Sequence, residues 1–160
     1  MGTDAMIQDK PAQEKGREVV AKMIRQLQDG RKWREIFQLD GPTMSGLEAQ
    51  VYKLYRNRLF ERAQIAGRGV LALDGDRLMV RVLMGDMALA EYRFSEAVEH
   101  LRIAHKLDPE AAVVRARLGE AMLKSGKPQG AAEHLRAALQ SDDLGPADRR
   151  RCQLLLDAIK

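Results

Sequence analysis

Cysteine and long apolar runs are both scarce in this chain. Its one cysteine, Cys152, excludes an internal disulfide framework and a thiolate metal cluster, and it fits a reducing compartment. No apolar run approaches the roughly 20 residues that a membrane-spanning helix needs. The N-terminal sequence also lacks the apolar segment of a secretory signal peptide. We therefore expect a cytoplasmic protein without stable membrane association.

The residues that are abundant favour helices. Hydrophobic residues make up 45% of the 160 positions and charged residues 31%, with Ala, Leu, Arg, Glu and Lys prominent, which predicts an all-α fold in one domain. The net charge of +4 is spread along the chain, apart from the run Arg149–Arg151. A solvated surface explains that run as well as nucleic acid or an anionic membrane does. The aromatic residues, only 4% of the chain, are not interleaved with the arginines, so no nucleic-acid partner is expected.

A repeat organises the middle of the chain. Moving the sequence along itself by 34 residues places the letters Glu-His-Leu-Arg of residues 99–102 on the same four letters of residues 133–136. The same shift aligns Met84-Gly85 with Leu118-Gly119, a large residue followed by a small one. Small residues let antiparallel helices approach closely, while the large ones fill the seam between them. This period and pattern resemble the tetratricopeptide repeat, which implies stacked helical hairpins.

Three repeats are predicted, over residues 44–77, 78–111 and 112–143. The first departs from the family pattern, since Val51 stands where glycine is usual and Gly67 where a large residue is usual. Around the repeats we expect a disordered leader (1–16), an N-terminal helical region (17–43) and a capping helix (146–160), because an open solenoid end needs covering. The helices of the repeats are predicted over residues 45–57, 60–73, 78–91, 94–107, 112–125 and 128–141.

The family resemblance implies a binding groove. In tetratricopeptide proteins the first helix of each hairpin lines the inside of a right-handed superhelix, and many of the positions that fall there in this chain are apolar. An apolar groove of this kind favours a partner segment as its occupant. The predicted groove residues are Tyr52, Tyr55, Arg56, Met79, Val82, Asp86, Leu89, Val113, Ala116, Glu120 and Leu123. A clamp for acidic tails is disfavoured, because Glu48 and Tyr52 occupy two of its positions and only Arg117 fits.

The layout of the whole chain narrows the resemblance. A polar leader, an N-terminal amphipathic helix, three repeats and one closing helix resemble the class II chaperones of bacterial type III secretion systems, which attend hydrophobic translocator subunits. The likeness implies a chaperone that holds an extended hydrophobic segment of a translocator in its groove before export. Chaperones of this class are usually acidic, whereas this chain is basic. The alternative is a general scaffold for assembling a secretion, pilus or envelope complex.

A homodimer is also expected, because many members of that class pair through their N-terminal helical region. Residues 17–28 place apolar side chains on one stripe of a helix, and a shorter helical turn with further apolar residues follows. The predicted dimer contacts are Val20, Met23, Ile24, Leu27, Trp33 and Phe37.

Catalytic and metal chemistry find no support in the sequence. His100 and His134 occupy the same position of successive repeats, and no histidine spacing matches a helical zinc motif. Cys152 lies on the apolar stripe of the predicted cap without a nearby base. We therefore expect no enzymatic activity, no metal and no cofactor.

Overall fold

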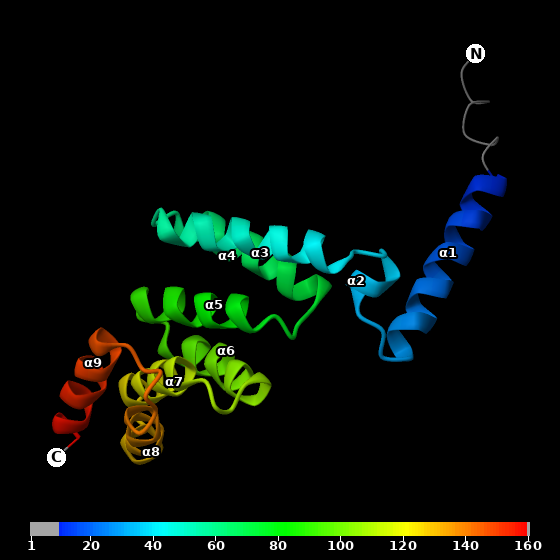
Figure 1. The fold of residues 1–160 in the computed structure, drawn as a ribbon. Coiled ribbons are helices and arrows are strands. Elements are labelled where there is room, and N and C mark those ends of the chain that lie inside the picture. Colours follow the sequence, from blue (N-terminus) through cyan, green and yellow to red (C-terminus); the bar gives the residue numbers. More distant parts are fainter. Residues whose placement is uncertain (1–9, 160) are drawn as a thin grey trace. The chain divides into compact units, whose positions relative to one another are not determined.

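The computed structural model describes residues 10–159, and in them all regular structure is helical (Figure 1). This confirms the predicted all-α fold. The chain divides into two compact units, Met1–Gly41 and Pro42–Lys160, which are described separately. Among the described residues, no helix combines the length and the apolar composition that a membrane-spanning segment requires. The helices are α1 (Lys10–Gln28), α2 (Trp33–Ile36), α3 (Gly41–Arg56), α4 (Phe60–Leu73), α5 (Leu78–Ala90), α6 (Phe94–Leu107), α7 (Ala112–Lys124), α8 (Pro128–Leu139) and α9 (Pro146–Asp157).

The first unit contains α1 and α2. Helix α1 begins at Lys10, so residues 10–16, which were predicted to be disordered, are helical, and residues 1–9 of that leader lie outside the described part. Lysine, glutamine and glutamate have high helix propensity, so the polar composition of the segment did not exclude a helix. Helix α1 is followed by Gly30, whose φ of +82° suits glycine and whose N–H donates to Leu27 O at 3.0 Å.

The second unit repeats its geometry every 34 residues. Helices α4, α6 and α8 begin at Phe60, Phe94 and Pro128, which are 34 residues apart. Helix α5 packs on α6, α6 on α7, and α7 on α8. The backbone turns into the left-handed region at Arg58 (φ 60°), Tyr92 (φ 61°) and Gly126 (φ 79°), again one repeat apart. Only the last of these three is a glycine, so the first two hairpins carry side chains in a conformation that costs about 1 kcal/mol or more.

Glycine and leucine close the second and third hairpins. A Cβ added to Gly85 of α5 would lie 2.6 Å from Leu101 Cγ of α6, and one added to Gly119 of α7 would lie 2.7 Å from Leu135 Cγ of α8. Ala97 and Ala131, on the opposing helices, are fully buried. The repeated large-and-small pattern of the sequence therefore corresponds to a repeated contact between the two helices of a hairpin.

The first hairpin uses its unusual residues differently. A Cβ added to Gly67 of α4 would lie 2.8 Å from Met84 Sδ, which belongs to α5 of the next hairpin. The large side chain thus comes from the neighbouring repeat instead of from position 67. Val51 of α3 is fully buried, so the residue that replaces the usual glycine contributes to the core.

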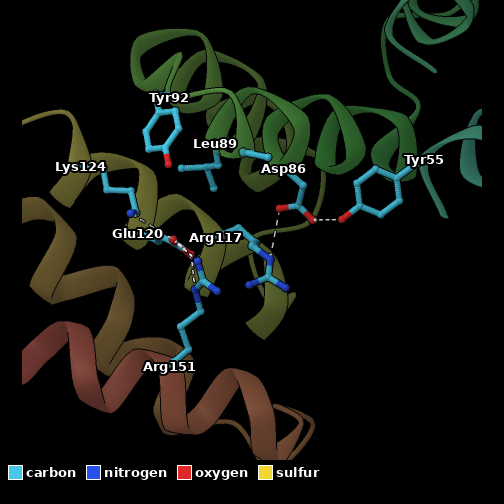
Figure 2. A pocket seen from close by; sticks show the side chains of 9 residues that line it. Tyr55, Asp86, Leu89, Tyr92, Arg117, Glu120, Lys124 and Arg151 are labelled. Atoms are coloured by element: carbon cyan, nitrogen blue, oxygen red, sulfur yellow. Dashed lines mark hydrogen bonds and ion pairs between the residues drawn. The ribbon is translucent and has the colours of Figure 1, made fainter. Parts of the chain in front are cut away.

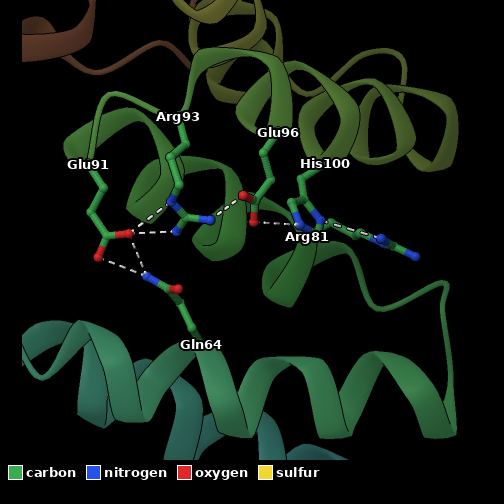
Figure 3. Close-up of polar contacts among 6 residues, drawn as sticks. All are labelled: Gln64, Arg81, Glu91, Arg93, Glu96 and His100. Carbon is green, nitrogen blue, oxygen red and sulfur yellow. Dashed lines mark hydrogen bonds and ion pairs between the residues drawn. The ribbon is translucent and has the colours of Figure 1, made fainter.

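Polar contacts also connect the first hairpin to the second (Figure 3). Gln64 of α4 donates from Nε2 to both carboxylate oxygens of Glu91, at 2.9 and 3.0 Å. Arg93 pairs with Glu91 at 2.6 Å and also with Glu96. These hydrogen bonds lower the pKa of the Glu91 carboxyl, with Gln64 as the largest cause. The contact aligns α4 with the turn between α5 and α6.

Helix α9 packs on α8 and α7 at the C-terminal end of the unit. Cys152 of α9 lies in an apolar cluster with Leu135, Leu144 and Ala116, and burial raises the pKa of its thiol. A buried thiol with a raised pKa is a poor nucleophile, in keeping with the structural role predicted for it. Helix α9 therefore covers apolar side chains of α7 and α8.

Candidate binding pocket

A pocket of about 300 Å³ lies among the first helices of the three hairpins and α9 (Figure 2). Helix α3 supplies one side chain to it, and α5, α7, α9 and the turn after α5 supply the others. Its lining combines aromatic and aliphatic surface with five charged groups. The lining residues are Tyr55, Asp86, Leu89, Ala90, Tyr92, Arg117, Glu120, Lys124 and Arg151.

Arg117 and Asp86 form one half of the polar network in the pocket. Arg117 Nε lies 3.2 Å from Asp86 Oδ1, and its Nη1 lies 3.0 Å from Asp148 Oδ1 of α9. The Tyr55 hydroxyl of α3 donates to Asp86 Oδ2 at 3.4 Å. Burial raises the pKa of the Asp86 carboxyl, although Arg117 opposes the shift, and burial together with Asp86 raises the pKa of Tyr55. Side chains from α3, α5, α7 and α9 thus share one network.

Glu120 and Arg151 form the other half. Arg151 Nε of α9 donates to Glu120 Oε2 at 2.7 Å, and Arg151 Nη2 donates to the second oxygen of the same carboxylate. This is the paired geometry in which a guanidinium binds a carboxylate most strongly. Lys124 Nζ lies 4.0 Å from Glu120 Oε1, one helical turn along α7. Helix α9 is therefore joined to α7 by charge as well as by apolar packing.

The structure brings four of the eleven predicted groove residues together. Tyr55, Asp86, Leu89 and Glu120 line the pocket. The remaining seven do not line it, and Ala116 differs from the prediction most, because it lies buried beside Leu135 and Cys152 under α9.

The other predicted groove residues lie at several places on the second unit. Arg56 donates from Nη1 to the Tyr52 hydroxyl at 3.1 Å on the exposed surface of α3. Near the starts of α5 and α7, Met79 and Val113 are exposed. Val82 is half-buried, and Leu123 packs against the core between the second and third hairpins.

Four lining residues were not predicted to face a partner, and a fifth, Arg117, was considered only for the acidic-tail clamp. Lys124 could have been found one turn after Glu120, on the same face of a helix. Tyr92 aligns with Gly126 in the 34-residue repeat, which marks a turn position. Arg151 has no comparable signal, because its partner lies 31 residues away in the sequence. Ala90 adds only a small apolar surface.

Glu48, which occupies one of the positions of an acidic-tail clamp, is paired with an arginine in the structure. Arg77 donates to it through Nε at 2.7 Å and through Nη2 at 2.8 Å. The arginine offsets the negative charge with which Glu48 would repel an acidic ligand, so Glu48 counts less against such a clamp than its position in the sequence alone does.

The predicted dimer residues lie on the first unit, and each is at least partly exposed. Val20, Ile24 and Phe37 are exposed, whereas Met23, Leu27 and Trp33 are half-buried. Trp33 stacks on Phe37 with ring centroids 5.5 Å apart. A shallow hollow on α1 is lined by Gly16, Arg17, Val20, Ala21 and Ile24.

The histidines do not come together as metal ligands. His105 and His134 meet edge to face with centroids 5.0 Å apart, and burial lowers the pKa of His134 and of His100. Within residues 10–159, no group of three metal-ligating side chains comes together.

Comparison with known proteins adds two kinds of likeness. Residues 88–150 match the tetratricopeptide repeat family, while no curated protein matches the sequence. The fold resembles a chain of a type III secretion complex from Aeromonas hydrophila, with 17% identity, a TM-score of 0.73 and coverage of 87% of this chain and 95% of that one. It also resembles the Yersinia enterocolitica translocator chaperone SycD, with 16% identity, a TM-score of 0.67 and coverage of 80% and 98%.

A third likeness is to Pseudomonas aeruginosa PcrH, solved with the chaperone-binding region of PopD, at 18% identity, a TM-score of 0.66 and coverage of 76% and 93%. At these identities the likeness shows a shared fold. The predicted resemblance to tetratricopeptide proteins and to translocator chaperones is therefore confirmed at the level of fold.

Proposed function

We propose that this chain is a type III secretion chaperone that holds an extended hydrophobic segment of a translocator subunit until export. The observation that carries the proposal is a pocket lined by the first helices of all three hairpins, in a fold shared with translocator chaperones. The apolar surface of the pocket comes from Leu89, Ala90 and the rings of Tyr55 and Tyr92. Burial of a client side chain in the pocket contributes about 25 cal/mol of binding free energy per Å² of apolar area. Binding thereby keeps membrane-seeking surface of the client out of water.

Tyr92 is the residue best suited to test this proposal. Tyr92 is 79% exposed at the edge of the pocket, so removal of its side chain leaves the core intact. Its left-handed backbone also suits glycine, the residue found at the equivalent Gly126. We expect Tyr92→Gly to weaken client binding roughly tenfold or more without lowering the melting temperature, because aromatic anchors dominate such interfaces.

The measurement is calorimetric titration with overlapping 20-residue peptides from hydrophobic secreted proteins encoded beside this gene. Arg58→Gly is the matched control, because Arg58 has the same turn geometry one repeat earlier and does not line the pocket. That variant should bind as the unchanged chain does. If no peptide binds and folded envelope or secretion components bind instead, the chaperone proposal fails and the scaffold alternative takes its place.

We also propose that the chain forms a homodimer through the apolar surface of α1 and α2. Val20→Glu combined with Ile24→Glu should convert a dimer into an 18.0 kDa monomer in light scattering, because both side chains are exposed on one stripe. Lys22→Glu, on the opposite side of the helix, should leave the mass unchanged. An unchanged mass in the double variant would refute this interface.

A further inference from the structure

The pocket presents cations to a ligand and covers its own carboxylates. Three cationic side chains line it, Arg117, Lys124 and Arg151, against the two carboxylates of Asp86 and Glu120. The side chain of Glu120 is 2% exposed and that of Asp86 is 17% exposed. By contrast, the side chain of Lys124 is 39% exposed and that of Arg151 is 56% exposed. An incoming group therefore meets positive charge first.

The carboxylates are also occupied by partners within the chain. Both oxygens of Glu120 accept hydrogen bonds from Arg151, and Asp86 accepts one from Tyr55 while pairing with Arg117. A lysine or arginine of a client would have to displace one of these partners.

Lys124 remains able to bind a ligand. Its ammonium group lies 4.0 Å from Glu120 Oε1, beyond hydrogen-bond distance, and 5.8 Å from the centre of the Phe94 ring. The lysine side chain of this pair is 39% exposed to water, so at this separation Glu120 holds Lys124 only weakly. The N–H donors of Lys124 can therefore turn toward an acceptor in the pocket.

We propose that the segment bound here carries an aspartate or glutamate side chain beside an apolar residue. The carboxylate lies between Lys124 and Arg151, and the apolar side chain covers Leu89 and Tyr92. This inference rests on the proposed function and specifies the chemistry of the client. The net charge of +4 on the chain supports it further, because complementary charge speeds encounter and disfavours basic competitors.

Peptide selection tests the proposal without knowledge of the client. Random 12-residue peptides, joined at their C-terminal ends to a phage coat protein, are selected on the full-length chain and sequenced. This attachment removes free C-terminal carboxylates, so only side chains supply acids. Selected peptides should be enriched in Asp or Glu next to an apolar residue. Selection on Lys124→Glu should shift the enrichment to Lys or Arg, whereas exposed Lys106 lies outside the pocket and Lys106→Glu should preserve it.

Affinities give a second measurement. Replacing the acidic residue of a selected peptide by its amide should weaken binding roughly threefold to tenfold. That difference should vanish with Lys124→Gln, which removes the cation without adding a carboxylate next to Glu120. Thermal unfolding followed by circular dichroism should show that Lys124→Gln folds as the unchanged chain does.

The possible failures are distinguishable. Enrichment of apolar peptides without acidic residues would overturn this inference and leave the proposed chaperone function standing. Selection of no peptide at all would overturn both.

Discussion

Replacing Gly119 by valine is expected to lower the free energy of unfolding by about 3 kcal/mol. A Cβ at this position would lie 2.7 Å from Leu135 Cγ and 3.1 Å from the backbone oxygen of Ala131. The leucine can change rotamer, but the backbone oxygen belongs to a helix and moves only if α8 moves. Valine adds two methyl groups to the same contact, so α7 and α8 must separate. Urea unfolding followed by circular dichroism measures the loss.

Gly69 provides the matched control for this prediction. It also lies within a helix, α4, but nothing stands within 4 Å of a Cβ added there. Gly69→Val should change the free energy of unfolding by less than about 0.5 kcal/mol, because the helix propensities of the two residues differ little. Equal effects at the two positions would mean that backbone preference decides the outcome, and the packing account of the hairpins would fail.

The repeat could be predicted because its cause is local. Gly85 and Gly119 stand at one spacing with a large residue before each, and close helix packing requires this pattern wherever it occurs. The fold class and the hairpins follow directly from it. The helix start at Lys10 was missed, because a polar composition was taken as disorder when the same residues favour helices.

The pocket was only partly predictable, because it depends on contacts between distant residues. A position on a first helix indicates Tyr55, Asp86 and Leu89, since the hairpin geometry points them inward. The same rule also selects Ala116, because a position on a first helix does not show that α9 covers this residue. Arg151 reaches the pocket only because α9 packs against α7, and no local pattern encodes that packing.

The connection between α9 and α7 leads to the second large effect. Arg151→Met is expected to lower the free energy of unfolding by about 2 kcal/mol, because it leaves the carboxylate of buried Glu120 without its main partner. The value lies below the range for fully buried pairs, since Arg151 is itself largely solvated and Lys124 remains 4.0 Å from Glu120. Methionine retains much of the apolar stem, so the loss reports on charge more than on packing.

A double-mutant cycle separates the ion pair from simple packing. Glu120→Met should alter stability by less than about 1 kcal/mol, because the arginine it releases is exposed to water. Combining the two substitutions should restore stability to near that of the unchanged chain, since no buried charge is left unpaired. Arg150→Met, at an exposed neighbouring position, controls for loss of charge on α9. Additive losses in the double variant would show that the pair stabilises the fold through shape alone, and the electrostatic connection between α9 and the pocket would have to be abandoned.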